Sequence, residues 1–320
     1  MYLNNKSDNM INHASYLNAE RKLRLVGLLL KGADRYGVPR AAQRYIYRNT
    51  DTTLLRAADV AGYAKRIDAG VLAILWMAIS AKMNLLVVSP DDAARAMLLS
   101  IAITFAHRIE QLHIIASSPE SLWFSDMSRN TISIYGKWHS QGRVVRLVDR
   151  SMELHSDRIV LEKVSGGEAK MLFAAASSGV PFMSSIRAVE SGKALIEKLT
   201  SRQFKVADDS INELDMAISI DGSGIMEMTE FGWLSRAEVV AGEVMRNGDS
   251  LRTCKIVEGG KPVAHAIPES KTIRAFGLLN GLSVRYSMIE LSARRDVIAG
   301  TLDADPRKWR DAFSSRGSGP

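Results

Sequence analysis

The sequence predicts an α/β fold with a mostly parallel sheet that helices cover on both faces. Between residues 68 and 220, short runs that are wholly or largely apolar alternate with helical patterns. Such runs, bounded by polar or turn-forming residues, are typical of strands buried on both faces. The chain has 320 residues, of which 46% are hydrophobic, so it can bury a sizeable core and is not a disordered protein.

The first βαβ unit lies between residues 68 and 116. A helix is expected from Asp68 to Ile79, because its apolar residues recur at helical spacing. The run Leu85–Val88, between Asn84 and Pro90, is expected to be a buried strand. A helix over residues 92–107 and a strand over residues 112–116 complete the unit.

The same alternation continues to residue 220. Strands are expected at 131–135, 158–164, 182–186 and 214–220, and helices near 144–154, 167–177 and 189–199. Strands that alternate with helices in this way predict a parallel sheet.

The C-terminal third has a different sequence pattern. Frequent glycines beyond Asp221 predict a small antiparallel β-hairpin region. A helical tail is expected from about residue 272, with Ser283 capping a helix to Ala299 and Pro306 opening a last short helix.

Cysteine and histidine usage exclude several classes of protein. The one cysteine, Cys254, excludes an internal disulfide framework and a cysteine-based zinc site, so we expect a cytoplasmic location. The six histidines are scattered without metal-ligand spacing, so we expect no metal site. The longest apolar stretches are too short to span a bilayer, and residues 1–18 are too polar for a signal peptide.

The positive charge is concentrated near the N-terminus. The stretch Arg21–Arg66 holds eleven Lys or Arg residues against three Asp residues, whereas the whole chain has a net charge of +7. Such a stretch suits anionic lipid, nucleic acid or an acidic protein, or is a solvated basic helix face. Any membrane contact is expected to be peripheral.

Several segments resemble the type II and type IV secretion ATPases, and especially their archaeal pilus and archaellum branch. The matching segments are Leu75–Val88, Asp157–Ala169, Met171–Gly179 and Ser184–Ala188, and the likeness covers about residues 51–316. The resemblance implies a RecA-like P-loop NTPase core over residues 63–320. Residues 1–62 would then be a basic, partly helical remnant of the family's N-terminal domain or linker.

The resemblance also implies a phosphate-binding loop that this chain has lost. The family pattern Gly-x-x-x-x-Gly-Lys-Thr falls on Ser89–Ala96, where Ser89 and Ala94 replace glycines, Arg95 replaces the lysine and Ala96 lacks the hydroxyl. Pro90 removes a backbone donor, and two carboxylates lie where phosphate would bind, one of which is expected to cap the following helix. The degenerate loop comprises Ser89, Pro90, Asp91, Asp92, Ala93, Ala94, Arg95 and Ala96.

The other catalytic positions of the family have changed too. Lys163 stands where the family places its Walker B glutamate, and the neighbouring Glu162 would reach that place only if the strand bulged. Val180 and Arg187 stand at the two positions of the histidine box, and Glu120 is the acidic residue left in the acidic box. Because phosphoryl transfer depends on positioning and electrostatics, losing these residues together predicts an inactive protein.

The sequence therefore predicts a pseudo-ATPase that serves as a scaffold or regulatory subunit of a pilus or secretion assembly machine. The expected partners are an active ATPase paralogue and a membrane platform protein, or further copies of the chain, with no specific nucleic acid. ATP and Mg²⁺ are the family's ligands, and their binding here is not expected. A weakly active hexameric motor using Arg95 and Glu162, and a membrane or nucleic-acid binder using Arg21–Arg66, are the alternatives.

Overall fold

The computed structural model describes most of the C-terminal five sixths of the chain. The described residues are 57–107, 109–117, 122, 131–135, 141–189, 192–207, 209–234, 244–246, 249–304 and 309–314. They belong to one compact unit, residues 52–320. The domain boundary expected after residue 62 falls within the first described helix, α3 (Ala57–Ala64). Most of the basic stretch, and Glu120, lie outside the described residues.

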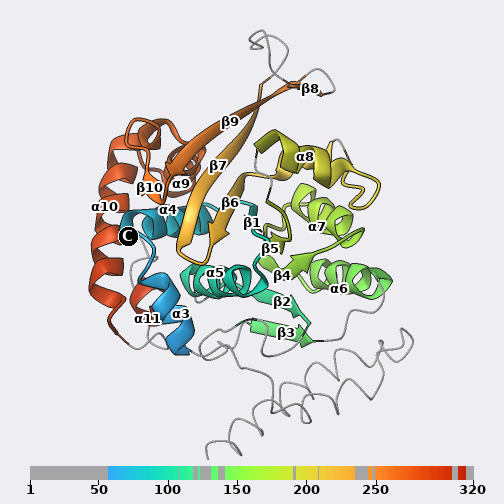
Figure 1. Ribbon diagram of the computed structural model, residues 1–320, viewed down its shortest axis with the longest axis horizontal. Coiled ribbons are helices and arrows are strands. Elements are labelled where there is room, and N and C mark those ends of the chain that lie inside the picture. The colour runs from blue at the N-terminus through green and yellow to red at the C-terminus, as the bar shows by residue number, and fades with distance from the viewer. Residues whose placement is uncertain are drawn as a thin grey trace, which may run out of the picture. The chain divides into compact units, whose positions relative to one another are not determined.

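One twisted sheet forms the centre of this unit (Figure 1). Its strand order is β10-β9-β7-β6-β1-β5-β4-β2-β3, and β8 pairs with β9. Six strands are parallel: β1 (Leu85–Val88), β2 (Leu112–Ala116), β3 (Thr131–Tyr135), β4 (Arg158–Val164), β5 (Phe182–Ile186) and β6 (Met216–Asp221). The strands expected at residues 85–88, 112–116, 131–135, 158–164 and 182–186 are confirmed.

Helices cover both faces of the parallel part. In Figure 1, α6 (Gln141–Glu153), α7 (Glu168–Ser177) and α8 (Gly192–Thr200) line one side, at the right. The other face carries α3, α4 (Ala69–Ser80), α5 (Asp92–Phe105), α9 (Lys271–Asn280), α10 (Val284–Thr301) and α11 (Trp309–Ser314). The alternation of β1 explains this: Leu85 and Val87 join the core with α4 and α5, whereas Leu86 and Val88 join the core with α7.

Antiparallel strands extend the sheet beyond β6. They are β7 (Gly224–Leu234), β8 (Val244–Arg246), β9 (Asp249–Glu258) and β10 (Lys261–Pro262). The hairpin region and the helical C-terminal end are therefore confirmed, as is the predicted fold class. Ser283 caps α10, accepting from the Tyr286 backbone N–H at 3.5 Å. No described helix is long and apolar enough to cross a membrane.

Several predicted boundaries differ from the structure by a few residues, and two of these differences have a clear cause. The helix expected from residue 189 begins at Gly192, because this glycine adopts φ +58°, a left-handed conformation through which a right-handed helix cannot run. The strand expected from Leu214 begins at Met216, because the short 3₁₀ helix Ser210–Glu213 directly precedes Leu214.

Candidate functional site

The degenerate loop lies where β1 ends and α5 begins, at the carboxyl edge of the parallel strands. Val88 is the last residue of β1, and the Ser89 backbone N–H donates to the Ile186 carbonyl at the end of β5 (3.3 Å). The loop is therefore held at the crevice where α/β proteins commonly bind ligands. What it can bind depends on the groups that it leaves available.

The N-terminus of α5 is already occupied by a carboxylate of the chain. Oδ1 of Asp91 accepts from the backbone N–H groups of Ala93 (2.8 Å) and Ala94 (3.2 Å). Asp91 itself donates its backbone N–H to the Ser89 hydroxyl at 3.1 Å. The predicted capping role of this segment is confirmed for Asp91. The donors that would cradle a phosphate therefore hold a side-chain anion instead.

Arg95, at the position of the family's lysine, is turned back into the loop. Its side chain is 4% exposed and donates to the Ser89 carbonyl and to the Asp92 carboxylate. Its Nε atom is buried without a hydrogen-bond partner among the described residues. A cation held in this way closes the loop and does not extend toward a bound anion.

Two carboxylates, Asp91 and Asp221, act on the Tyr63 hydroxyl beside the loop. Burial, followed by the Asp221 and Asp91 carboxylates, raises the pKa of the Tyr63 hydroxyl. That hydroxyl donates to the Asp221 carbonyl at 2.8 Å, so α3 is tied to the end of β6 beside the loop. A triphosphate brought here would meet the Asp91 and Asp221 carboxylates.

The Glu162 carboxylate is held by a hydrogen bond to the backbone. The β4–β5 register shifts between Leu161 and Val164, so the strand bulges where Glu162 and Lys163 lie. The Glu162 carboxylate accepts from the backbone N–H of Ser117, which follows β2. Since β4 lies between β5 and β2, this contact turns the carboxylate away from β1. Lys163 is exposed.

The two histidine-box positions do not lie together. Arg187 directly follows β5 and is exposed at the carboxyl edge, next to Ile186, which bonds the loop. Val180 precedes β5, and its N–H donates to the Ala175 carbonyl at the end of α7 (3.0 Å). Because the strands are parallel, Val180 lies at the opposite edge from Ser89–Ala96.

The residues present do not fit ATP or Mg²⁺. The α5 N-terminus holds Asp91, Arg95 is bonded within the loop, and Ala96 offers no hydroxyl to a metal. Over the described ranges, no group of three or more His, Cys, Asp or Glu residues is placed to hold a metal ion.

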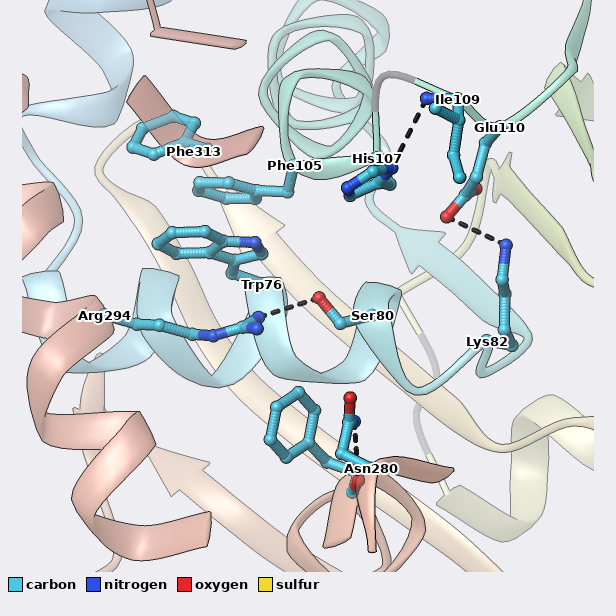
Figure 2. A pocket seen from close by; sticks show the side chains of 11 residues that line it. Trp76, Ser80, Lys82, Phe105, His107, Ile109, Glu110, Asn280, Arg294 and Phe313 are labelled. Atoms are coloured by element: carbon cyan, nitrogen blue, oxygen red, sulfur yellow. Dashed lines mark hydrogen bonds and ion pairs between the residues drawn. The ribbon is translucent and has the colours of Figure 1, made fainter. Parts of the chain in front are cut away.

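A pocket of about 270 Å³ lies at the other edge of the sheet, before β1 and β2 (Figure 2). Aromatic and polar side chains line it: Trp76, Ser80, Lys82, Phe105, His107, Ile109, Glu110, Phe276, Asn280, Arg294 and Phe313. Sequence analysis missed this pocket, since α4, α5, α9, α10 and α11 build it from distant parts of the chain.

Arg294 is stacked in the wall of this pocket. Its guanidinium carbon lies 4.4 Å from the Trp76 ring centroid and 4.7 Å from that of Phe276. It donates to the Ser80 hydroxyl at 2.7 Å and to Glu290 at 2.9 Å. Its position in the sequence indicates that Arg294 is buried, because it shares one face of α10 with the buried Ser287 and Ile298.

A buried ion pair lies behind the pocket. Glu110 contacts Lys82 at 2.8 Å and Arg158 at 3.3 Å, and the Arg158 side chain is fully buried. Burial alone would raise the pKa of Glu110, but Arg158 and Lys82 hold it below its usual value. In Figure 2, Lys82 and Glu110 face each other at one side of the pocket. These residues can hold a small molecule, but they supply no activated nucleophile among the described side chains.

Similarity to known proteins is found among solved structures and covers part of the chain. No protein-family model matches the chain, and no curated protein matches it. Among solved structures, it is similar to the VirB11 ATPase from the Brucella suis type IV secretion system, with 17% identity over 58% of this chain and 62% of that one, at a TM-score of 0.42.

Two further solved structures are similar to the chain at lower identity. One is the ATPase DotB of Legionella pneumophila, with 11% identity, 71% of this chain, 55% of that chain and a TM-score of 0.36. Another is the pilus retraction motor PilT with bound ADP, with 12% identity, 68% of this chain, 60% of that chain and a TM-score of 0.36. The chain thus spans less than two thirds of the length of each of the three.

Proposed function

We propose that this protein is a pseudo-ATPase, a non-catalytic scaffold or regulatory subunit of a pilus or secretion assembly machine. The observation that carries the proposal is the closed loop after β1. Asp91 fills the anion site of α5, and Arg95 is bonded to the loop's own Ser89 carbonyl. A protein with this loop retains an α/β packing unit but has lost the groups that hold a triphosphate.

The alternative of a weakly active motor requires Arg95 and Glu162 to act on ATP. Both side chains have structural partners, since Arg95 bonds Ser89 and Asp92, and Glu162 bonds Ser117. A motor would have to break these contacts before binding its substrate. We therefore favour the scaffold over the motor.

Nucleotide binding tests the proposal directly. Isothermal titration of the full chain with Mg-ATP is expected to give no measurable heat of binding, and a phosphate-release assay no turnover. Losing several charge-assisted hydrogen bonds weakens binding at least about a thousandfold relative to an intact P-loop. Micromolar affinity with Mg²⁺-dependent turnover would contradict the proposal.

A variant in which the loop 89–96 is rebuilt to the P-loop pattern is the matched control for the nucleotide-binding test. The variant Ser89→Gly, Asp91→Ser, Ala94→Gly, Arg95→Lys and Ala96→Thr restores the glycines, the cation and the hydroxyl at their positions. Binding by the rebuilt chain, without binding by the natural chain, attributes the loss to this loop. Equal affinity in both chains would show that the loop does not decide nucleotide binding.

The expected partners follow from the same proposal. We propose that the unit acts in the cytoplasm beside an active ATPase paralogue and a membrane platform protein. Sedimentation of the full chain mixed with such a paralogue is expected to give a complex larger than either alone, in the absence of nucleotide. Separate sedimentation of the two proteins would count against a shared assembly.

A further inference from the structure

The corner between α9 and α10 exposes large apolar side chains to an unusual degree. Every residue from 278 to 286 is exposed. The apolar corner, as we call it, comprises Leu278 (85% exposed), Leu279 (60%), Leu282 (37%), Val284 (43%), Tyr286 (61%) and Ile289 (55%). An exposed cluster of this kind marks an interaction site more often than a single exposed side chain does.

The corner does not need these side chains for its own packing. Ile273, Phe276 and Ile298 are buried against the core, whereas the leucines point outward. The turn is closed by the Leu282 N–H, which donates to the Gly277 carbonyl at 2.8 Å. A Cβ added at Gly277 would lie 2.7 Å from the Leu282 carbonyl oxygen, so the close approach of α9 and α10 requires glycine there.

The apolar side chains point around the corner and do not form one stripe. Leu278 and Leu279 are adjacent on α9 and so are about 100° apart, and Val284 and Tyr286 are about 200° apart on α10. A helix that docks into the groove of a partner protein presents its apolar residues at i, i+3, i+4 and i+7, on one face. Exposed apolar side chains on two helices and in the turn between them, with the polar Asn280 and Ser283 among them, fit the boundary of a lipid bilayer, where apolar and polar groups meet.

The charge of the corner has one sign. Residues 271–289 contain Lys271, Arg274 and Arg285 and no Asp or Glu. Lys271 pairs with Asp215 at 2.5 Å and Arg274 with Glu269 at 3.7 Å, whereas Arg285 has no ion pair with the described residues. An unpaired arginine within an apolar tip is complementary to an anionic surface.

We propose that the apolar corner is a membrane-contact site, which inserts into the headgroup region of an anionic bilayer with Arg285 at the phosphates. Interfacial helices with Leu and aromatic residues beside Lys or Arg bury their apolar side about 5–10 Å deep in this way. This site differs from the basic stretch Arg21–Arg66, and it does not rest on the loss of ATP binding.

A label at the corner tests insertion directly. In a Cys254→Ser background, Leu279→Cys is labelled with the environment-sensitive fluorophore NBD and mixed with phosphatidylcholine vesicles with and without phosphatidylglycerol. A blue shift and quenching by brominated lipid are expected with the anionic vesicles, and a label at Val189→Cys, which is 79% exposed elsewhere, is expected to give neither. An unchanged spectrum at position 279 would overturn the proposal.

Vesicle flotation of the unlabelled full chain gives the second readout. Leu278→Ser with Leu279→Ser is expected to lower the partition coefficient at least about tenfold, whereas Val189→Ser leaves it unchanged. Because both leucines are exposed, the fold should be retained, which circular dichroism checks. Binding that survives the double substitution, or a concentration-dependent dimer that the substitution abolishes without any vesicle binding, would overturn it.

Discussion

The two edges of the parallel sheet differ in how they use charge. At the carboxyl edge, Asp91 and Arg95 bond groups of their own loop, only a few residues away in the sequence. At the amino edge, buried charges join elements far apart in the sequence: Arg158 reaches Glu110, and Arg294 reaches Ser80. The contacts of Asp91 and Arg95 are therefore local and structural. The buried arginines that hold distant elements together lie at the opposite edge.

Removing Arg158 should produce the largest effect and test this contrast. Its guanidinium donates to the Ile79 carbonyl at 2.7 Å, the Met83 carbonyl at 3.3 Å and Glu110 at 3.3 Å. Arg158→Met leaves a buried carboxylate with one partner, so we expect a loss of about 3–5 kcal/mol in urea unfolding. Adding Glu110→Leu to Arg158→Met should recover part of the lost stability. If Arg158→Met alone were as stable as the natural protein, the proposed difference between the two edges would be wrong.

The pH dependence of stability should show the second largest effect, through His113 on β2. Burial lowers the pKa of this fully buried histidine to about 4, against the raising effect of Asp157. The unfolded chain takes up the proton near pH 6.5, so stability is complete above about pH 6.5 and falls as the pH drops toward about 4. The loss should reach roughly 3 kcal/mol.

Unfolding in urea at several pH values measures this loss. His113→Leu should flatten the slope between about pH 6.5 and 4.5, whereas the exposed His155→Gln should leave it unchanged. The same slope in the natural protein and in His113→Leu would assign the titration to other groups.

Removing the cap of α5 should cost less, because only local bonds are lost. Asp91→Ala releases the N–H groups of Ala93 and Ala94 to water and should lower the free energy of unfolding by about 1 kcal/mol. Asp91→Asn retains an acceptor oxygen, so it should lose only a few tenths of that. Equal losses in the two variants, measured by thermal unfolding, would mean that the charge matters more than the hydrogen bonds.

Much of the fold could be predicted because its signals are local. The strands β1, β2 and β5 are short, mostly apolar runs that are wholly buried, and Asp91 and Ser283 cap helices as their positions indicate. The contacts of the loop after β1 are local as well, since Asp91 and Arg95 bond groups within six positions of the chain.

The remaining features depend on contacts that no local pattern encodes. The bulge in β4 sends Glu162 to Ser117, a contact across 45 positions that follows from strand order. The aligned pair Val180 and Arg187 lie at opposite edges, because one precedes β5 and the other follows it. The pocket joins Trp76 to Arg294 and Phe313, and this pairing is set by how the C-terminal helices pack on α4.

Placing a glutamate at position 163 should have the smallest effect, and this absence of effect is informative. Lys163→Glu returns a glutamate to the position where the resemblance implies one, but the side chain is exposed on a bulged strand. We expect a stability change within about 0.5 kcal/mol and no phosphate release, since Asp91 and Arg95 still close the loop. Adding Lys163→Glu to the rebuilt loop is the control, because a glutamate can act only once nucleotide is held. ATP turnover by Lys163→Glu alone would mean that the carboxyl edge of the sheet binds ATP although its loop is closed. The proposed difference between the two edges would then be wrong.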